Sequence, residues 1–297
     1  ADLYEESLRL ATAAGDRALV QRSVTNLLDI HTSAADHPGA SVGLALEQLD
    51  RERRANAVTG VAVLAGNLAY CMAEMGRLDD AMAYADEAVA AASAVVPAVL
   101  RNQLILRSYV HRLRGEQAAS ALDDSEAGLL PADPEPQMEG WHLLWHAWSK
   151  WSDEPQAATD HLVTALRRPI SQTANRAWVA HETARMAFRL ADRELLEDAV
   201  AVLRSCALDG GPGLRAKLEW IEALPSDDTE VRVRDAAVQL EELGWRRLAL
   251  DAWADAALMA ARAGRSSDAT ERALALARAT GIHPLLDPLP ERRWLPG

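Results

Sequence analysis

The chain has 297 residues, of which 49% are hydrophobic, and a formal net charge of −13 at pH 7. A chain this negative repels phosphate backbones and anionic membrane surfaces, because binding to either rests on Lys and Arg. We therefore expect no nucleic-acid and no membrane partner for this region. No apolar run reaches the length of a membrane span, and the two cysteines lie far apart, which together favour a cytoplasmic, reducing environment.

The hydrophobic residues are mostly Ala and Leu, and the chain has one Phe. Ala, Leu, Arg and Glu favour helices, whereas the residues that favour strands are few. The composition predicts an all-α fold.

The first predicted element is an amphipathic helix over residues 3–14 that has no partner of its own in the pattern. The chain also begins with Ala rather than Met. We expect from these two features that it lies inside a longer protein.

Turn signals then recur at intervals of about 36 to 40 residues, each long enough for two helices and their loops. They fall at Asp36, Gly76, Gly115, Asp153, Asp192, Asp228 and Gly264. A single helix pair cannot bury its apolar face alone, so neighbouring pairs stack. We expect an all-α solenoid of about seven antiparallel helix hairpins over residues 1–280, in which small residues such as Ala69, Ala81, Ala85 and Ala88 lie between paired helices.

The tryptophan-rich segment WHLLWHAWSKW spans residues 141–151. On a helix, successive residues advance by about 100°, which puts Trp141, Trp145 and Trp148 on one face as a core stripe. The alternative is an aromatic cage for a cation. His142 and His146 share another face at the spacing of two Zn²⁺ ligands, but a zinc site needs further ligands and the HExxH motif is absent, so we expect no metal.

The last predicted segment is a tail over residues 281–297 that contains four prolines, which exclude a continued helix. Trp294 and the leucines of this tail could pack on the last hairpin, or the tail could be an extended linker.

Two stretches carry a family resemblance. GRLDDAMAYADEAV, residues 76–89, resembles the second half of a tetratricopeptide repeat, and so does AGRSSDATERALALA, residues 263–277. Matches to the motif are Trp253, Ala257, Gly264 and Ala269 in the last repeat, and Trp141, Leu144, Trp148 and Ala157 in the tryptophan-rich repeat. Trp145 departs from the motif, which has a small residue there. The resemblance implies a right-handed superhelix of degenerate repeats.

A narrower resemblance links LYEESLRLATAAGD, LEELGWRRLALDAWADAALMAARAGR and RALALARATG to the helical C-terminal arrays of large bacterial regulators. These regulators are STAND-type ATPases, some of them fused to LuxR-type DNA-binding domains or to nucleotide cyclases. The resemblance implies a sensor arm of a signalling or transcriptional regulator. The chain has no GxxxxGK[ST] loop, no GxSxG and no recognisable helix-turn-helix, so we expect no catalysis and no cofactor.

In the tetratricopeptide motif, the helix face between the core positions lines a concave groove. By that register the predicted groove residues are Asn67, Tyr70, Asn102, Tyr109, Arg112, Glu139, His142, His146, Glu182, Met186 and Arg189. Such a polar groove suits a protein or peptide segment, or the regulator's own N-terminal domains. The alternative is a small-ligand or peptide-pheromone sensor of the same fold, which a closed pocket around Tyr109, His142 and His146 would favour.

Overall fold

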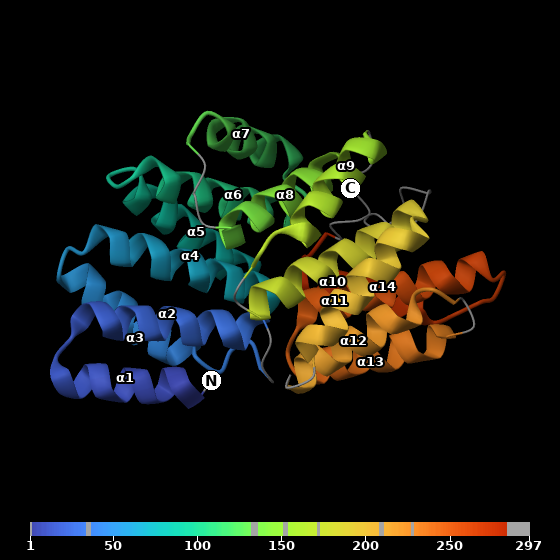
Figure 1. The fold of residues 1–297 in the computed structure, drawn as a ribbon, viewed down its shortest axis with the longest axis horizontal. Coiled ribbons are helices and arrows are strands. Elements are labelled where there is room, and N and C mark those ends of the chain that lie inside the picture. Colours follow the sequence, from blue (N-terminus) through green and yellow to red (C-terminus); the bar gives the residue numbers. More distant parts are fainter. Residues whose placement is uncertain are drawn as a thin grey trace. The chain divides into compact units, whose positions relative to one another are not determined.

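The computed structural model describes residues 2–33, 37–131, 136–150, 154–170, 173–207, 211–226 and 229–283. These residues form fifteen α-helices, and the described ranges contain no β-strand (Figure 1). The all-α prediction is therefore confirmed. Within these ranges, no helix combines the length and the apolar character needed to cross a membrane. Of the tail predicted over residues 281–297, residues 284–297 lie outside the described residues.

The chain divides into two compact units, Ala1–Asp133 and Pro134–Gly297. The helices of unit 1 are α1 (Asp2–Ala14), α2 (Arg17–Ser33), α3 (Val42–Arg54), α4 (Val58–Glu74), α5 (Leu78–Ala92), α6 (Pro97–Leu113) and α7 (Gln117–Gly128). The helices of unit 2 are α8 (Pro136–Lys150), α9 (Pro155–Arg167), α10 (Thr173–Leu190), α11 (Arg193–Ala207), α12 (Pro212–Ala223), α13 (Glu230–Glu242), α14 (Arg246–Arg262) and α15 (Ala269–Thr280).

Within each unit, helices that follow one another in the chain pack side by side, for example α4 with α5, α6 with α7, α8 with α9 and α10 with α11. Their short connections make each pair antiparallel. The first helices of neighbouring pairs also touch, as α4 does with α6 and α10 with α12. Figure 1 shows these helices stacked in successive layers within each unit.

Glycines in the left-handed backbone region end several of these helices, where a Cβ would be strained. Gly76, Gly115 and Gly264 have φ values of 75°, 75° and 65°. All three are turn positions predicted from the sequence. Asp36, Asp153 and Asp228 lie outside the described residues.

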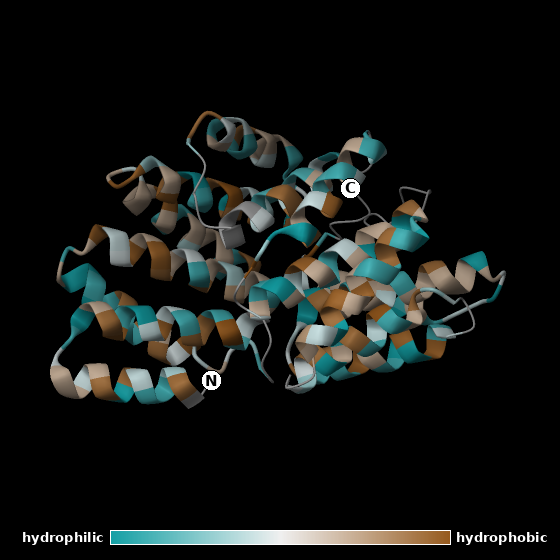
Figure 2. Cartoon of the chain, viewed as in Figure 1, coloured by the Kyte–Doolittle hydropathy of each residue, from teal (hydrophilic) through white to brown (hydrophobic). Residues whose placement is uncertain are grey.

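Small side chains let the helix axes approach closely in unit 1. Ala69, Ala81, Ala85 and Ala88 are completely buried, as expected from the sequence. Gly66 of α4 lies against Gln103 of α6, where an added Cβ would come within 2.1 Å of the amide oxygen. Hydrophobic and hydrophilic residues alternate along the helices, as expected for helices with one buried face (Figure 2).

Both cysteines, Cys71 and Cys206, are free thiols buried in this packing. Burial raises the pKa of Cys71 to about 11. The Cys71 thiol donates a hydrogen bond to the backbone carbonyl of Pro38 over 3.0 Å. Cys71 is thus a protonated core residue rather than a nucleophile.

Candidate functional site

The tryptophans of α8 lie in the core of unit 2. Trp145 and Trp148 are 1% and 3% exposed, which confirms the core interpretation for both residues. Trp141 is half-buried and stacks on Trp178 of α10, with ring centroids 4.2 Å apart and planes at 18°. The edge of Trp148 meets the same Trp178 ring at 5.9 Å. These rings fix α8 against α10 rather than forming an open cage.

The two histidines of α8 have different surroundings. His142 is buried, and His146 is half-buried with its ring 5.6 Å from that of His161 on α9. The side chain of Glu139, which was predicted on the same face, lies outside the described residues. In the described parts of the chain, no group of three or more His, Cys, Asp or Glu side chains is placed to hold a metal ion.

In unit 1 the structure brings two predicted site residues together. The rings of Tyr70 and Tyr109 are 6.0 Å apart, and both residues are buried. The Tyr109 hydroxyl donates a 2.5 Å hydrogen bond to the carboxylate of Glu74, which is fully buried. Asn67 and Asn102, the other predicted residues on these helices, are half-buried. The two tyrosines therefore belong to the packing between α4 and α6.

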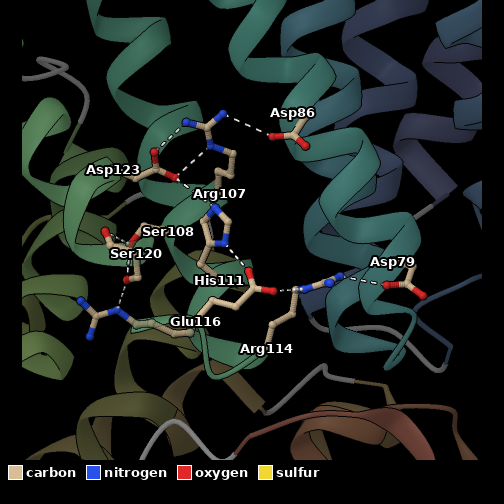
Figure 3. A network of polar contacts seen from close by, with 10 residues as sticks. Asp79, Asp86, Arg107, Ser108, His111, Arg114, Glu116, Ser120 and Asp123 are labelled. Carbon is tan, nitrogen blue, oxygen red and sulfur yellow. Dashed lines mark hydrogen bonds and ion pairs between the residues drawn. The ribbon is translucent and has the colours of Figure 1, made fainter. Parts of the chain in front are cut away.

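Arg112 of α6, also predicted in the groove, turns toward the second helix of its own pair. It donates to Ser120 at 2.9 Å and to Asp124 at 2.6 Å, both on α7. These contacts belong to a larger polar network along α6 (Figure 3).

The same network continues from α6 to both of its neighbours (Figure 3). Arg107 pairs with Asp123 of α7 at 2.6 Å and with Asp86 of α5 at 3.3 Å. The ring of His111 lies 2.6 Å from Glu116, and this hydrogen bond is the main reason why the pKa of Glu116 is lowered. The network holds α5, α6 and α7 together. The polar groups named here bind one another across these helices.

The polar residues of unit 2 are enclosed more completely. Helix α10, TANRAWVAHETARMAFRL, has 13 of its 18 residues buried, including residues on every face. Helix α14 has 13 of 17 residues buried. A helix surrounded on all sides forces any charged residue it carries into the protein interior. Burial of a charge requires a partner, because desolvation of an unpaired ion is very costly.

The charged residues of these two helices meet in one place. We call Glu182, Arg185 and Arg189 of α10 with Arg247, Asp251 and Asp255 of α14 the α10–α14 cluster. All six side chains are at most 2% exposed.

Three sets of contacts join the two helices within the cluster. Arg247 binds Glu182 at 3.0 Å, Arg185 binds Asp251 at 2.8 Å, and Arg189 binds Asp255. Arg185 also approaches Asp255, with Nε 3.5 Å from Oδ2. In these pairs, a higher residue number on α10 goes with a higher residue number on α14. The two helices therefore run parallel.

Coulombic attraction keeps the cluster ionised despite its burial. Burial works against the charge of Glu182, yet Arg247 and Arg185 outweigh it and hold the pKa of this carboxyl well below its usual range. His181, beside the cluster, differs because burial dominates and lowers its pKa to about 4. His181 is therefore neutral at pH 7.

Two residues of α12 border the cluster. The Arg185 guanidinium lies 4.9 Å from the centre of the Trp220 ring, and the His181 ring meets the same indole at 4.8 Å. Lys217, which is 2% exposed, places its ammonium 4.0 Å from the ring centre of Trp245. The cluster thus contacts an aromatic ring of α12 through Arg185.

Several hydrogen-bonding atoms at this site have no hydrogen-bond partner within the described part of the chain. They are Arg185 Nη2, Arg189 Nε and Nη1, His181 Nε2 and the indole nitrogen of Trp220. A buried polar group without a hydrogen bond costs about 1–3 kcal/mol, and a charged one costs more. A concentration of such atoms at one place is unusual in a packed core.

Of the predicted groove residues, Glu182 and Arg189 belong to this cluster, and Met186 is completely buried beside them. Arg185, Arg247, Asp251 and Asp255 were not predicted. The sequence does contain a feature that points to the two aspartates. Asp251 and Asp255 interrupt a stretch of α14 that is otherwise alanine-rich and apolar. An isolated charge on a helix that is apolar all round must find a buried partner.

The chain matches no model of a known protein family, no curated protein and no solved structure.

Proposed function

We propose that the chain is a non-catalytic sensor module that binds a small ligand against the first helices of its hairpins. In this proposal it forms a right-handed, tetratricopeptide-like solenoid of about seven hairpins. The observation that carries the proposal is the α10–α14 cluster, in which buried charges from two such helices converge and leave hydrogen-bond donors unused.

The burial of the site favours a small ligand over a peptide. A peptide in a groove needs side chains that face solvent before it binds. Tyr109, His142, Glu182 and Met186 are instead almost completely enclosed. Small ligands are held in enclosed sites where a few polar groups fix their orientation.

The sequence resemblance supplies the biological setting of the proposal. Arrays of this kind form the sensor arm of bacterial STAND-type regulators. We infer that this chain serves in a cytoplasmic signalling or transcriptional regulator, where occupancy of the site would change how the helices pack and so signal to the rest of the regulator.

Native mass spectrometry of the full chain, after incubation with a small-molecule extract of bacterial cells, tests the proposal. A retained adduct of a few hundred daltons, present at one copy per chain, is the expected result. A parallel pull-down with the chain immobilised detects a protein or peptide partner. Capture of a peptide without any small adduct would favour the groove instead, and turnover of a compound in the extract would contradict a non-catalytic module.

A further inference from the structure

Helix α7 has the opposite polarity to an ordinary surface helix. Its buried side is polar, since Ser120 and Asp123 are 1% and 4% exposed and Asp124 is half-buried. Leu122 and the C-cap residue Leu129 are instead 72% and 85% exposed. A helix on a protein surface normally buries its apolar side and turns its charged side to solvent. Packing within unit 1 therefore does not account for the outer side of α7.

Contacts with α6 hold α7 in this orientation (Figure 3). Arg107 donates a hydrogen bond to Asp123 over 2.6 Å, and Arg112 donates one to Asp124 over 2.6 Å. Arg112 also donates to the Ser120 hydroxyl over 2.9 Å. Turning α7 about its axis to bury its leucines would break these contacts, so the polar contacts with α6 keep the leucines exposed.

The exposed leucines of α7 belong to one strip of the helix surface. We call Ala118, Leu122, Ser125 and Leu129 the α7 stripe. Successive helix residues advance by about 100°, which brings these four positions onto one side. All four are exposed, and none carries a charge. Single exposed leucines are common on protein surfaces, whereas apolar residues gathered on one strip are typical of a contact surface.

The size of the α7 stripe favours a single helix as the partner over a second copy of this chain. Helix α7 has 12 residues. It is therefore about 18 Å long and about 10 Å across, which gives a face on the order of 200 Å². Each partner in a stable protein interface buries about 800 Å². Two chains with a net charge of −13 each would also repel one another.

The charge of this region favours a basic partner. Helix α7 contains three acidic residues and no basic residue, and Glu126 is exposed beside the α7 stripe. Lys or Arg residues at the edge of a partner's apolar face would be attracted to this surface, whereas Asp and Glu would be repelled.

We propose that the α7 stripe binds one basic amphipathic helix of another protein. Apolar side chains of that helix would cover Leu122 and Leu129, and its Lys or Arg residues would approach Glu126. This inference goes beyond the proposed ligand sensing, because it concerns a surface of unit 1 and uses no residue of the α10–α14 cluster.

Fluorescence anisotropy of a labelled model helix, titrated with the full chain, tests the proposal. The probe is a peptide of about 18 residues with leucines at helical spacing on one face and lysines on the other. We expect saturable binding at one site per chain. A peptide with Glu in place of every Lys should bind at least tenfold more weakly. So should a scrambled peptide of the same composition, which has no apolar face.

Matched pairs of leucine variants locate the binding site. Leu122→Ser with Leu129→Ser should weaken binding of the lysine peptide at least tenfold. Leu3→Ser with Leu10→Ser on α1 is the control and should bind as the wild type does. Leu3 and Leu10 are 86% and 53% exposed and have the same spacing of seven positions. Circular dichroism checks that both pairs remain folded.

Thiol labelling of Leu122→Cys gives a second measurement. The native cysteines are buried, so the new thiol should be the one that reacts rapidly with a maleimide in the folded chain. Saturating lysine peptide should slow that reaction at least tenfold.

Four outcomes would overturn the proposal. The first is no saturable binding of the lysine peptide to the folded wild type. The second is an equal loss of binding in the α1 and α7 pairs, which would reflect general attraction to an acidic chain. The third is slow labelling of Leu122→Cys without peptide, which would show that the chain itself covers the stripe. The fourth is self-association in sedimentation experiments that the α7 pair abolishes, which would make a second copy the partner.

The proposed ligand sensing can be judged separately from this surface. A small-molecule adduct seen by native mass spectrometry should persist in Leu122→Ser with Leu129→Ser. Loss of peptide binding in that pair, with the adduct retained, would support both proposals. Failure of the peptide titration would leave the adduct result unaffected.

Discussion

At the residue scale, this protein is distinguished by charged side chains that lie deep in a helical core. Buried ion pairs stabilise a fold less than their geometry suggests, because desolvation offsets the attraction. Removing one partner nevertheless destabilises the fold strongly, since it leaves the other charge buried without a counterion. The residues of the α10–α14 cluster therefore depend on one another for stability.

His181 gives a stability prediction that depends on pH. Its pKa of about 4 in the folded chain lies below the ordinary value of 6.5, because burial disfavours the charged ring. The unfolded chain therefore takes up a proton first, and stability should fall as pH drops from 6.5 toward 4. The decrease in the free energy of unfolding that comes from His181 is on the order of 3 kcal/mol.

Urea unfolding from pH 7 to pH 4 measures this effect. His181→Gln should remove most of the pH dependence of stability that comes from His181. His37→Gln is the matched control, because the His37 side chain is exposed. Equal pH dependence in the wild type and in His181→Gln would contradict the assignment.

Asp255 gives a second prediction at this scale. Asp255→Asn removes the carboxylate that Arg185 and Arg189 share and should destabilise the chain by about 3–5 kcal/mol. Asp80→Asn is the comparison, because its pair with Arg77 is half exposed and should contribute less than about 1 kcal/mol. Chemical denaturation of both variants gives the two values, and similar losses would show that Asp255 is not a buried ionic partner.

At the element scale, packing of small residues sets how closely the helices approach. Gly66 on α4 is the tightest example, because Gln103 of α6 occupies the space that a side chain would need. Gly43 on α3 meets nothing within 4 Å of an added Cβ. The two glycines are both helical but are required to different degrees.

Gly66→Ala should therefore destabilise the chain by no more than about 1 kcal/mol, because the Gln103 amide that must move is the end of a flexible side chain and alanine favours the helix. Gly43→Ala should leave stability unchanged or raise it by up to about 1 kcal/mol, because alanine favours the helix. Thermal unfolding of the two variants makes the comparison. Adding Gln103→Ala to Gly66→Ala should recover part of the loss, and no recovery would place the clash elsewhere.

At the scale of the whole molecule, the chain consists of two compact units that meet in sequence at residues 133 and 134. Each unit has its own buried aliphatic core and its own polar network, along α6 in unit 1 and between α10 and α14 in unit 2. In stacked helical arrays most stability comes from contacts between neighbouring helices. Each unit should therefore hold its fold without the other.

Expression of residues 1–133 and 134–297 as separate chains tests this expectation. Both fragments should show helical circular dichroism and a cooperative thermal transition, because the helix pairs within each unit are intact. A fragment that is unfolded alone and regains helicity only when mixed with the other would show that the units depend on each other.

The sequence by itself determined the helical class and much of the local pattern. The alanine and leucine content, the glycine turns at Gly76, Gly115 and Gly264, and the spacing of alanines along α4 and α5 are local properties that can be read from the sequence. The core positions of Trp145 and Trp148 likewise follow from helical spacing.

Only the tertiary structure decided which polar residues are enclosed and with what partner. Arg185 and Asp251 are separated by 66 positions in the chain, and Glu182 and Arg247 by 65. Helical register put Glu182 and Arg189 on a candidate face, but it could not tell whether that face meets solvent or another helix. That distinction depends on how α10, α12 and α14 stack, because burial is a property of neighbouring helices rather than of any one of them.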